Sequence, residues 1–211
     1  MTHQLAFRAA QSHESAQGAD LIMLTLREFG THFFGFGSHP RAMRVLEQLF
    51  MQPGSRFSHQ HALFGIREDG HIAGLLMPFT KRSMRRTWLA TALDLIRIYN
   101  PAEMLTFIQR LLQYRSEERI SQDELYIAHL AVDPHHQRSG YGQQLLSHAA
   151  YLAQSQGLSK LSLLTEIENQ PAINLYHKFG FIITETIPYP PDLHYLGSKA
   201  SLRMVKNLIK E

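Results

Sequence analysis

A buried strand that leads through a glycine-containing loop into a helix most limits what this chain can fold into. Leu125 to Val132 is predicted to be a strand because nearly all of its residues are apolar or aromatic. The next nine residues have the polar, glycine-containing composition of a loop. Gly142 to Gln154 then places leucines and alanines on one side at helical spacing. Such a strand, loop and helix are typical of layered α/β domains.

The loop and the first turn of the helix have the properties of an anion-binding site. The first turn of a helix has free backbone N–H groups and the positive end of the helix dipole. Gly140 and Gly142 have no Cβ, so a diphosphate could approach the backbone closely, and Gln137 and Arg138 add side-chain donors. The segment is not a P-loop, since no Gly-Lys-Ser/Thr follows, and its spacing differs from the dinucleotide-binding fingerprint. Spacing alone also allows a purely structural turn.

Strands and helices alternate along most of the remaining chain. Further strands are expected at 6–10, 62–67, 72–77, 161–167, 181–186 and 201–207, and further helices at 21–29, 41–51 and 171–179. Asp20 is expected to cap the first helix, and Gly30 to Pro40 to form a loop or a frayed helix end. The Asp69-Gly70 pair predicts a hairpin between the second and third strands.

Residues 81–122 interrupt this rhythm. Two helices, at 88–99 and 102–114, are predicted there, and we interpret them as a helical hairpin inserted between strands. The inserted helices could cover an acceptor cleft or pair two copies in a homodimer. We expect a single α/β domain over residues 1–211.

A second informative segment lies one strand downstream. It reads Asn169-Gln170-Pro171-Ala172-Ile173-Asn174-Leu175-Tyr176-His177-Lys178-Phe179-Gly180-Phe181. Together the two segments resemble the GNAT family, the Gcn5-related N-acetyltransferases. The family's pyrophosphate signature, Gln or Arg, two residues, Gly, one residue, Gly or Ala, is filled by Gln137, Gly140 and Gly142. Its helix-to-strand signature is filled by Asn169, Ala172, Leu175, Tyr176, Gly180 and Phe181.

The resemblance extends over roughly residues 125–186 and implies a fold and a set of site residues. The fold would be a mixed, mostly antiparallel central sheet flanked by helices. The pantetheine arm of acetyl-CoA would pair with the backbone of Leu130, Ala131 and Val132. The pyrophosphate would lie on the backbone N–H groups of Gln137, Arg138, Ser139, Gly140, Tyr141, Gly142 and Gln143. Asn169 and Ala172 would border the thioester, and Tyr176 would protonate the leaving thiolate.

Several of these residues also have ordinary structural interpretations. Asn169 is a satisfactory helix N-cap without any ligand, and Tyr176 could be a buried aromatic residue. The general base is open among His129, Tyr126 and Glu124. His129 has the most suitable unperturbed pKa, although it could be a core histidine.

The composition narrows the chemistry further. The chain has no cysteine, which excludes a Cys-linked acyl-enzyme and favours direct attack by an amine on the thioester. The thirteen histidines, with the pairs His59 and His61 and His135 and His136, do not form a convincing metal site, so none is expected. No apolar run approaches the length of a membrane span, and we expect a cytoplasmic protein that does not engage a membrane.

Three functions remain to be compared. The first is an N-acetyltransferase that moves acetyl from acetyl-CoA to an amine of a small molecule or a peptide. The alternative is a non-catalytic acyl-CoA-binding module that senses or regulates. The third, a nucleic-acid-associated protein, depends on a net charge of only +3 and on the basic run Lys81 to Arg86, which we interpret instead as a solvated turn.

Overall fold

A seven-stranded sheet forms the centre of the fold in the computed structural model, which describes residues 4–113 and 120–208. The strands are β1 (Ala6–Ala9), β2 (Leu63–Ile66), β3 (Ile72–Thr80), β4 (Glu124–Val132), β5 (Lys160–Glu166), β6 (Ile182–Pro188) and β7 (Ala200–Asn207). The helices are α1 (Ser15–Gly35), α2 (His39–Met51), α3 (Lys81–Ile98), α4 (Pro101–Gln113), α5 (Tyr141–Ser155) and α6 (Gln170–Phe179).

The sheet is mixed and mostly antiparallel, as predicted. Its strand order is β1-β2-β3-β4-β5-β7-β6, and β4 and β5 are the parallel neighbours among the described strands. The parallel pairing starts at Glu124 opposite Lys160 and stops at Ile127 opposite Leu163. Both strands continue beyond that point, so β4 and β5 separate at their carboxyl ends.

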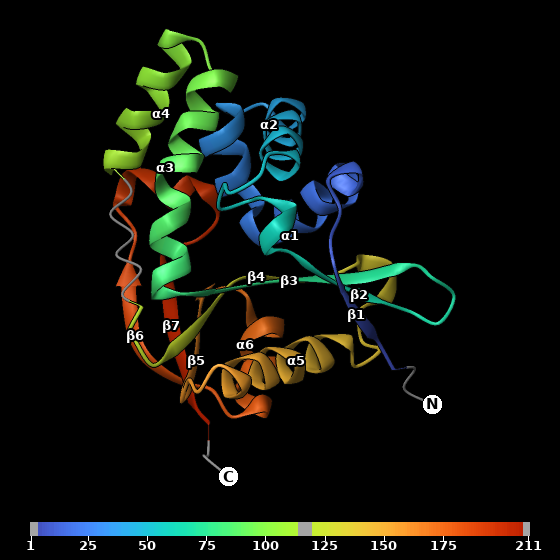
Figure 1. Ribbon diagram of the computed structural model, residues 1–211. Helices are drawn as coiled ribbons and strands as arrows, with labels where there is room; N and C mark the ends of the chain where they lie inside the picture. Colours follow the sequence, from blue (N-terminus) through green and yellow to red (C-terminus); the bar gives the residue numbers. More distant parts are fainter. Residues whose placement is uncertain (1–3, 114–119, 209–211) are drawn as a thin grey trace.

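Helices cover both faces of the sheet (Figure 1). On one face, α1 and α2, which contributes the fully buried Phe50, pack against fully buried side chains of the sheet such as Phe64 and Phe79. On the other face, the predicted helix Gly142–Gln154 appears as α5, and its Leu145 and Leu146 are completely buried. The sheet is therefore the middle of three layers, with a separate apolar core on each side.

The first helical region differs from the sequence prediction. The helix begins at Ser15 rather than after Asp20, and it continues through a kink at Arg27 to Gly35. The predicted loop from Gly30 to Pro40 is therefore mostly helical. The reason is that Phe29, Phe33 and Phe34 are buried in the core, which stabilises the helix beyond its local propensity.

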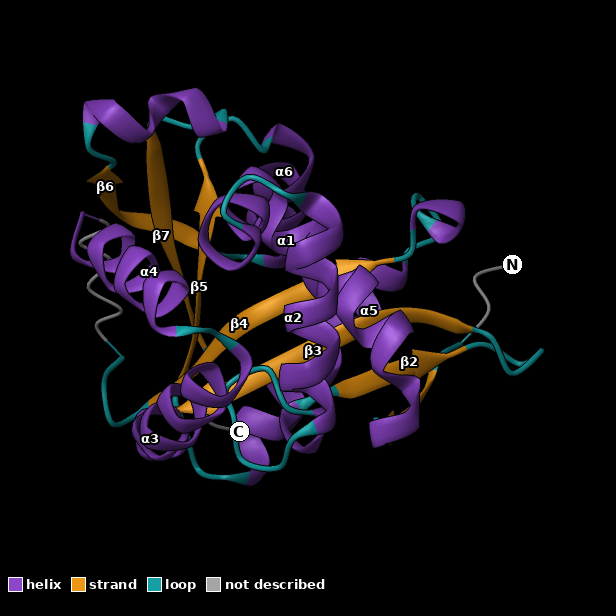
Figure 2. Ribbon diagram, turned by 90° about the horizontal axis from the view of Figure 1, so that it is seen from above, coloured by secondary structure: helices purple, strands orange, loops and turns teal. Residues whose placement is uncertain are grey.

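The insertion after β3 is a helical hairpin, as predicted, but its first helix begins earlier than expected. The basic run Lys81 to Arg86 was expected to form a solvated turn, but it is helical and begins α3. Thr80 and Ser83 form a capping box, in which the Thr80 hydroxyl accepts a hydrogen bond from the Ser83 N–H at 3.1 Å. The last predicted residue of the second helix, 114, lies outside the described residues. Seen from above, α3 and α4 stand beside α1 and α2, toward the side of β6 and β7 (Figure 2).

No helix within residues 4–113 or 120–208 is both long and apolar enough to cross a membrane.

The packing of α1 on α2 gives a test of this fold. Gly18 of α1 lies against the ring of the fully buried Phe50, and a Cβ at Gly18 would overlap that ring. We expect Gly18→Ala to lower the free energy of unfolding by about 1–3 kcal/mol, because overpacking outweighs the better helix propensity of alanine. Urea unfolding measures this, and Phe50→Leu in the same chain should restore part of the loss. A more stable Gly18→Ala protein would contradict this packing.

Candidate functional site

The separation of β4 from β5 creates the opening in which the predicted residues gather. In β4, His129 pairs with Met77 of β3 and Ile127 pairs with Pro78, so Ala128 has no opposite residue and forms a bulge. Pro78 has no N–H to contribute to the sheet at this position. The bulge places Ala128 and His129 next to the α1 side of the sheet, where both contact the same core.

A cleft of about 1410 Å³ occupies this opening. It is bordered by the ends of β4 and β5, the kink of α1, the start of α5, and α6. Of the predicted site residues, those lining it are His129, Leu130, Ala131, Val132, Gln137, Arg138, Gly140, Tyr141, Gly142, Gln143, Asn169, Ala172 and Tyr176. Ser139 does not line it. Two segments separated by a whole strand in sequence are thus combined in one cavity.

The backbone of the loop before α5 is free to bind an anion. Within the described ranges, the N–H groups from Gln137 to Gly142 donate to no acceptor of the protein. The Gln143 N–H differs, because it donates to the Gly140 carbonyl at 3.1 Å. These unpaired donors precede and begin a helix of 15 residues, where the helix dipole favours negative charge.

The two glycines of this loop have different physical roles. Gly140 has φ of 81°, a left-handed conformation that glycine adopts without strain. A Cβ at Gly142 would lie 2.8 Å from Cδ2 of Leu175, so the absence of a side chain there lets α5 approach α6 closely. Tyr141 is buried in the core, and only its backbone is available to a ligand.

The free edge of β4 supplies further backbone groups. The N–H of Asp133 donates to the Ala73 carbonyl of the β3 segment at 2.9 Å. Because successive residues of a strand direct their N–H and C=O groups to opposite sides, those of Leu130 and Val132 point to the opening. The Val132 carbonyl accepts a hydrogen bond from the Gln137 side chain at 3.4 Å, which ties the loop back to the strand.

The other wall of the cleft comes from α6. Asn169 is the N-cap of this helix, and its side-chain oxygen accepts a hydrogen bond from the Ala172 N–H at 3.4 Å. Tyr176 is 8% exposed and borders the cleft, and burial raises the pKa of its phenol to about 12. Tyr176 is therefore a protonated hydrogen-bond donor at neutral pH. The capping role of Asn169 is real, and it does not prevent contact with a ligand.

His129 is buried but oriented by a specific contact. The Thr25 hydroxyl donates to the Ile22 carbonyl at 2.8 Å and lies 2.6 Å from His129 Nδ1, so Nδ1 carries a proton and donates to Thr25. Nε2 is then the unprotonated nitrogen, and it has no hydrogen-bond partner among the described residues. Burial, with a smaller contribution from the charge of Arg56, lowers the pKa of His129 to about 3. The imidazole is neutral at physiological pH and is a weak base.

The other two base candidates have different surroundings. Glu124 is 2% exposed and forms a buried ion pair with Arg203 at 2.7 Å, at the end of β4 away from the opening. Glu124 does not line the cleft. Tyr126 lines it and belongs to the core on the α1 side.

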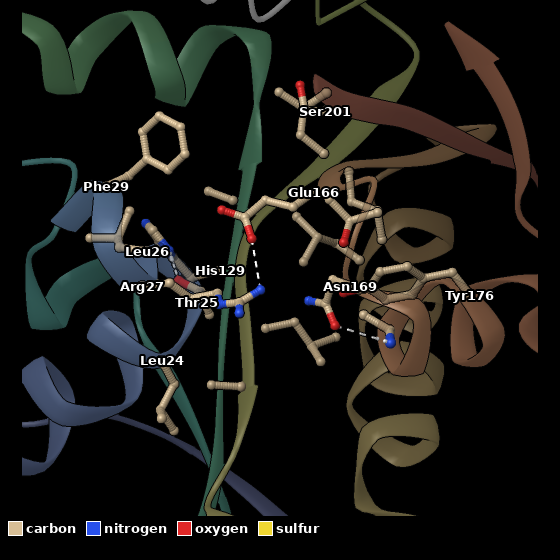
Figure 3. A pocket seen from close by; sticks show the side chains of 18 of the residues that line it. Leu24, Thr25, Leu26, Arg27, Phe29, His129, Glu166, Asn169, Tyr176 and Ser201 are labelled. Atoms are coloured by element: carbon tan, nitrogen blue, oxygen red, sulfur yellow. Dashed lines mark hydrogen bonds and ion pairs between the residues drawn. The ribbon is translucent and has the colours of Figure 1, made fainter. Parts of the chain in front are cut away.

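The structure adds a pair of residues that the sequence analysis missed. Glu166, the last residue of β5, lines the cleft, and its carboxylate accepts a hydrogen bond from the Arg27 guanidinium at 2.8 Å (Figure 3). Burial raises the pKa of Glu166, and Arg27 opposes that shift. Nothing in the sequence connects two residues 139 positions apart, so only the fold could identify the pair.

Arg27 is held in an unusual backbone conformation. Its φ of 51° and ψ of −132° interrupt α1 and lie in a region that residues with side chains rarely adopt, at a cost of about 1–3 kcal/mol. The kink turns Arg27 toward the opening between β4 and β5, where it meets Glu166 (Figure 3).

The rest of the cleft wall is aromatic and aliphatic. The contributing side chains from α1, the insertion and the segments beside them are Phe29, Phe33, Phe34, Phe57, Met84, Trp88, Phe107, Leu111 and Tyr189. The insertion therefore borders the cleft, and whether it covers an acceptor there stays a prediction. Pairing of two copies through its exposed apolar side chains stays a prediction.

In the described part of the chain, no three His, Asp or Glu side chains converge in a way that could hold a metal ion.

Comparison with known proteins agrees with this geometry. The model of the acetyltransferase (GNAT) family matches residues 24–181, which include the kink of α1, the diverging strands, α5 and α6. This chain belongs to the GNAT family of acetyltransferases. The predicted family is thereby confirmed, and so is the predicted fold, a mixed and mostly antiparallel sheet flanked by helices.

Similarity to individual GNAT proteins is more limited. The chain is 40% identical to human N-alpha-acetyltransferase 30 over 57 residues, 27% of this chain and 16% of that protein. It is 39% identical to the [ribosomal protein bS18]-alanine N-acetyltransferase of Escherichia coli K12 over 59 residues, 28% of this chain and 40% of the relative. A solved N-acetyltransferase from Staphylococcus aureus Mu50 aligns over 95% of this chain and 100% of its own, with a TM-score of 0.68 and 20% identity. The chain thus matches less than half of either curated relative.

The buried state of His129 makes a prediction for stability against pH. The unfolded chain binds a proton at His129 below about pH 6.5, whereas the folded protein does so only near pH 3. The unfolded state therefore holds more protons in this window, and the free energy of unfolding should fall as the pH falls, by up to about 1.4 kcal/mol per pH unit. Urea unfolding at a series of pH values should give a flatter profile for His129→Gln. The exposed His135→Gln should keep the parental profile, and equal slopes in all three proteins would contradict the buried neutral imidazole.

Proposed function

We propose that this chain is an N-acetyltransferase that moves acetyl from acetyl-CoA directly to an amine. The observation that carries the proposal is the joint presence of free backbone donors before α5 and an open strand edge on β4, facing one cleft. The first suits a diphosphate and the second suits an extended amide chain, and acetyl-CoA contains both.

The residues proposed to hold acetyl-CoA are those predicted from sequence, except Gln143, whose N–H donates to the Gly140 carbonyl. The pyrophosphate would lie on the N–H groups between Gln137 and Gly142, and the pantetheine amides would pair with the Leu130 and Val132 backbone. Asn169 and Ala172 would border the thioester. The cleft crosses the sheet at this point, so the acceptor can approach from the α1 and insertion side.

Acetyl-CoA supplies the activated acetyl group, and the protein contributes position and proton transfer. The amine loses a proton, its nitrogen forms a bond to the acetyl carbon, and the carbon–sulfur bond breaks. The Tyr176 hydroxyl, which is protonated at neutral pH, would donate its proton to the leaving sulfur. Backbone N–H groups near Val132 would stabilise the developing oxyanion. His129 and Glu166 are the two side chains placed to receive the amine proton.

The acceptor amine belongs to a small molecule or a peptide. The Escherichia coli relative acts on an alanine of a ribosomal protein, according to its name, whereas the cleft of this chain has its own aromatic wall from the insertion. A panel of small amines and short peptides, followed by release of the CoA thiol, would select between them. The alternative function, a non-catalytic acyl-CoA sensor, predicts binding without thiol release for every amine.

Cofactor binding can be tested by a pair of variants at one position. Gly140→Asp and Gly140→Asn have the same shape, both tolerate a left-handed backbone, and they differ in charge. We expect acetyl-CoA at about a hundred times its Kd to stabilise the parent by about 2.7 kcal/mol, seen as a rise in Tm of several degrees.

The rise should be retained in large part by Gly140→Asn and lost in Gly140→Asp, because the carboxylate repels the pyrophosphate. Equal shifts in the two variants would contradict a pyrophosphate site at this loop.

The acid role of Tyr176 predicts a specific kinetic loss. Tyr176→Phe should lower kcat by about 10²-fold with little change in KM for acetyl-CoA, because the hydroxyl acts only on the leaving group. The measurement is steady-state thiol release with an amine found in the panel. Tyr151→Phe, an exposed position on α5, is the control and should keep the parental kcat. A parental kcat in Tyr176→Phe would exclude the acid role.

A further inference from the structure

We propose that the Glu166 carboxylate is the subsite that binds the acceptor's ammonium group, which takes the position that Arg27 occupies in the free protein. Glu166 then accepts the proton that the ammonium loses before its nitrogen attacks the thioester. This inference rests on the proposed acetyl transfer and adds the residue that recognises the acceptor.

The position of Glu166 is the first argument. It is the last residue of β5, at the open end of the strand pair, and its side chain is 14% exposed within the cleft. One edge of β5 is fixed there, because Glu166 pairs with Ser201 of β7. The Glu166 carbonyl also accepts a hydrogen bond from the Asn169 N–H at 3.0 Å, which links it to the cap of α6. Glu166 is thus held rigidly beside the helix that carries Tyr176.

The partner of Glu166 is the second argument. A carboxylate that faces a cleft is stabilised by a cation, and here the cation is a guanidinium 2.8 Å away. Arg27 is 52% exposed and comes from the kink of α1 on the acceptor side (Figure 3). An alkylammonium offers Glu166 the same charge and the same hydrogen bond, so it can replace Arg27 without leaving a carboxylate unpaired.

The strain at Arg27 is the third argument. A left-handed arginine at a helix kink persists only where the surroundings hold it, and such residues gather at ligand sites. Among residues 4–113 and 120–208, the exposed guanidinium forms one ion pair, with Glu166, and it can swing into solvent when an amine arrives. The charges around Glu166 are then the incoming cation and Glu168, while His129 across the opening is neutral.

His129 is less suited to this role. Its imidazole is buried, and the same burial that lowers its pKa also disfavours a positively charged ammonium group beside it. A carboxylate attracts the ammonium first and receives its proton afterwards. In balanced form, the nitrogen–hydrogen bond breaks, the proton moves to Glu166, and the freed electron pair forms the bond to the acetyl carbon. The carbon–sulfur bond of the thioester then breaks, and the sulfur leaves with its electron pair and takes a proton from Tyr176.

The first experiment measures binding and needs no turnover. Hexylammonium chloride is titrated against the protein saturated with CoA and followed by calorimetry, with 1-heptanol as the neutral probe of similar length. The parent should bind the ammonium in preference to the alcohol, and Glu166→Gln should lose that preference.

Two further variants make the result specific. Glu14→Gln is the matched control, because the Arg8–Glu14 pair has similar exposure at 41% and 11% but lies outside the cleft. It should bind like the parent. Arg27→Gly removes the competing cation, and glycine adopts the backbone conformation of the kink without strain. This variant should bind the ammonium about two- to five-fold more tightly than the parent, as expected for loss of an exposed ion pair.

The second experiment measures acetyl transfer at saturating acetyl-CoA. Glu166→Gln should lower kcat/KM for the amine by at least about 10²-fold while its melting shift with acetyl-CoA stays parental. Equal ammonium affinity in the parent and Glu166→Gln, or weaker binding in Arg27→Gly, would overturn the proposal. A parent that binds no acetyl-CoA would instead overturn the proposed function, so the two failures are distinguishable.

Discussion

The end of parallel pairing between β4 and β5 is the constraint on which the rest of the site depends. Up to Ile127 and Leu163 the two strands satisfy each other's backbone groups, and beyond that point they diverge. An unpaired strand edge in the middle of a sheet is costly unless a ligand or solvent completes its hydrogen bonds. The bulge at Ala128 of β4, next to Pro78 of β3, lies where this divergence begins. The cleft, the loop before α5 and the capped start of α6 all meet there.

The two sides of the cleft differ in the groups that they present to a ligand. On one side, backbone groups of β4 and of the loop before α5 suit a long, phosphorylated acyl carrier, and this requires few particular side chains. On the other side, the kink of α1 and the inserted hairpin form an aromatic wall around the ion pair of Arg27 and Glu166. This division explains why a family can keep its donor while acceptors differ, because sites vary on a constant fold.

The sequence analysis identified residues on one side of the cleft and missed most of those on the other side, for a physical reason. Gln137 to Gly142 and Asn169 to Tyr176 are local segments whose turn and helix chemistry can be read directly, and the structure brings them together. The parts missed depend on contacts distant in sequence, such as the helical Gly30 to Gly35 stabilised by the core and the pair of Arg27 with Glu166. His129 was selected for its unperturbed pKa, and only its burial shows how far that pKa falls. Whether it or Glu166 receives the proton stays a prediction.

The most direct measurement of the central claim is hydrogen exchange of individual backbone amides with and without CoA. The N–H groups from Gln137 to Gly142 have no protein acceptor within the described residues, so they should exchange quickly in the free protein. The account predicts that CoA slows exchange at these amides and at Leu130 and Val132, while the exposed β2–β3 turn at Asp69 and Gly70 is unaffected. Protection elsewhere, with these amides unchanged, would contradict a CoA site at the diverging ends of β4 and β5.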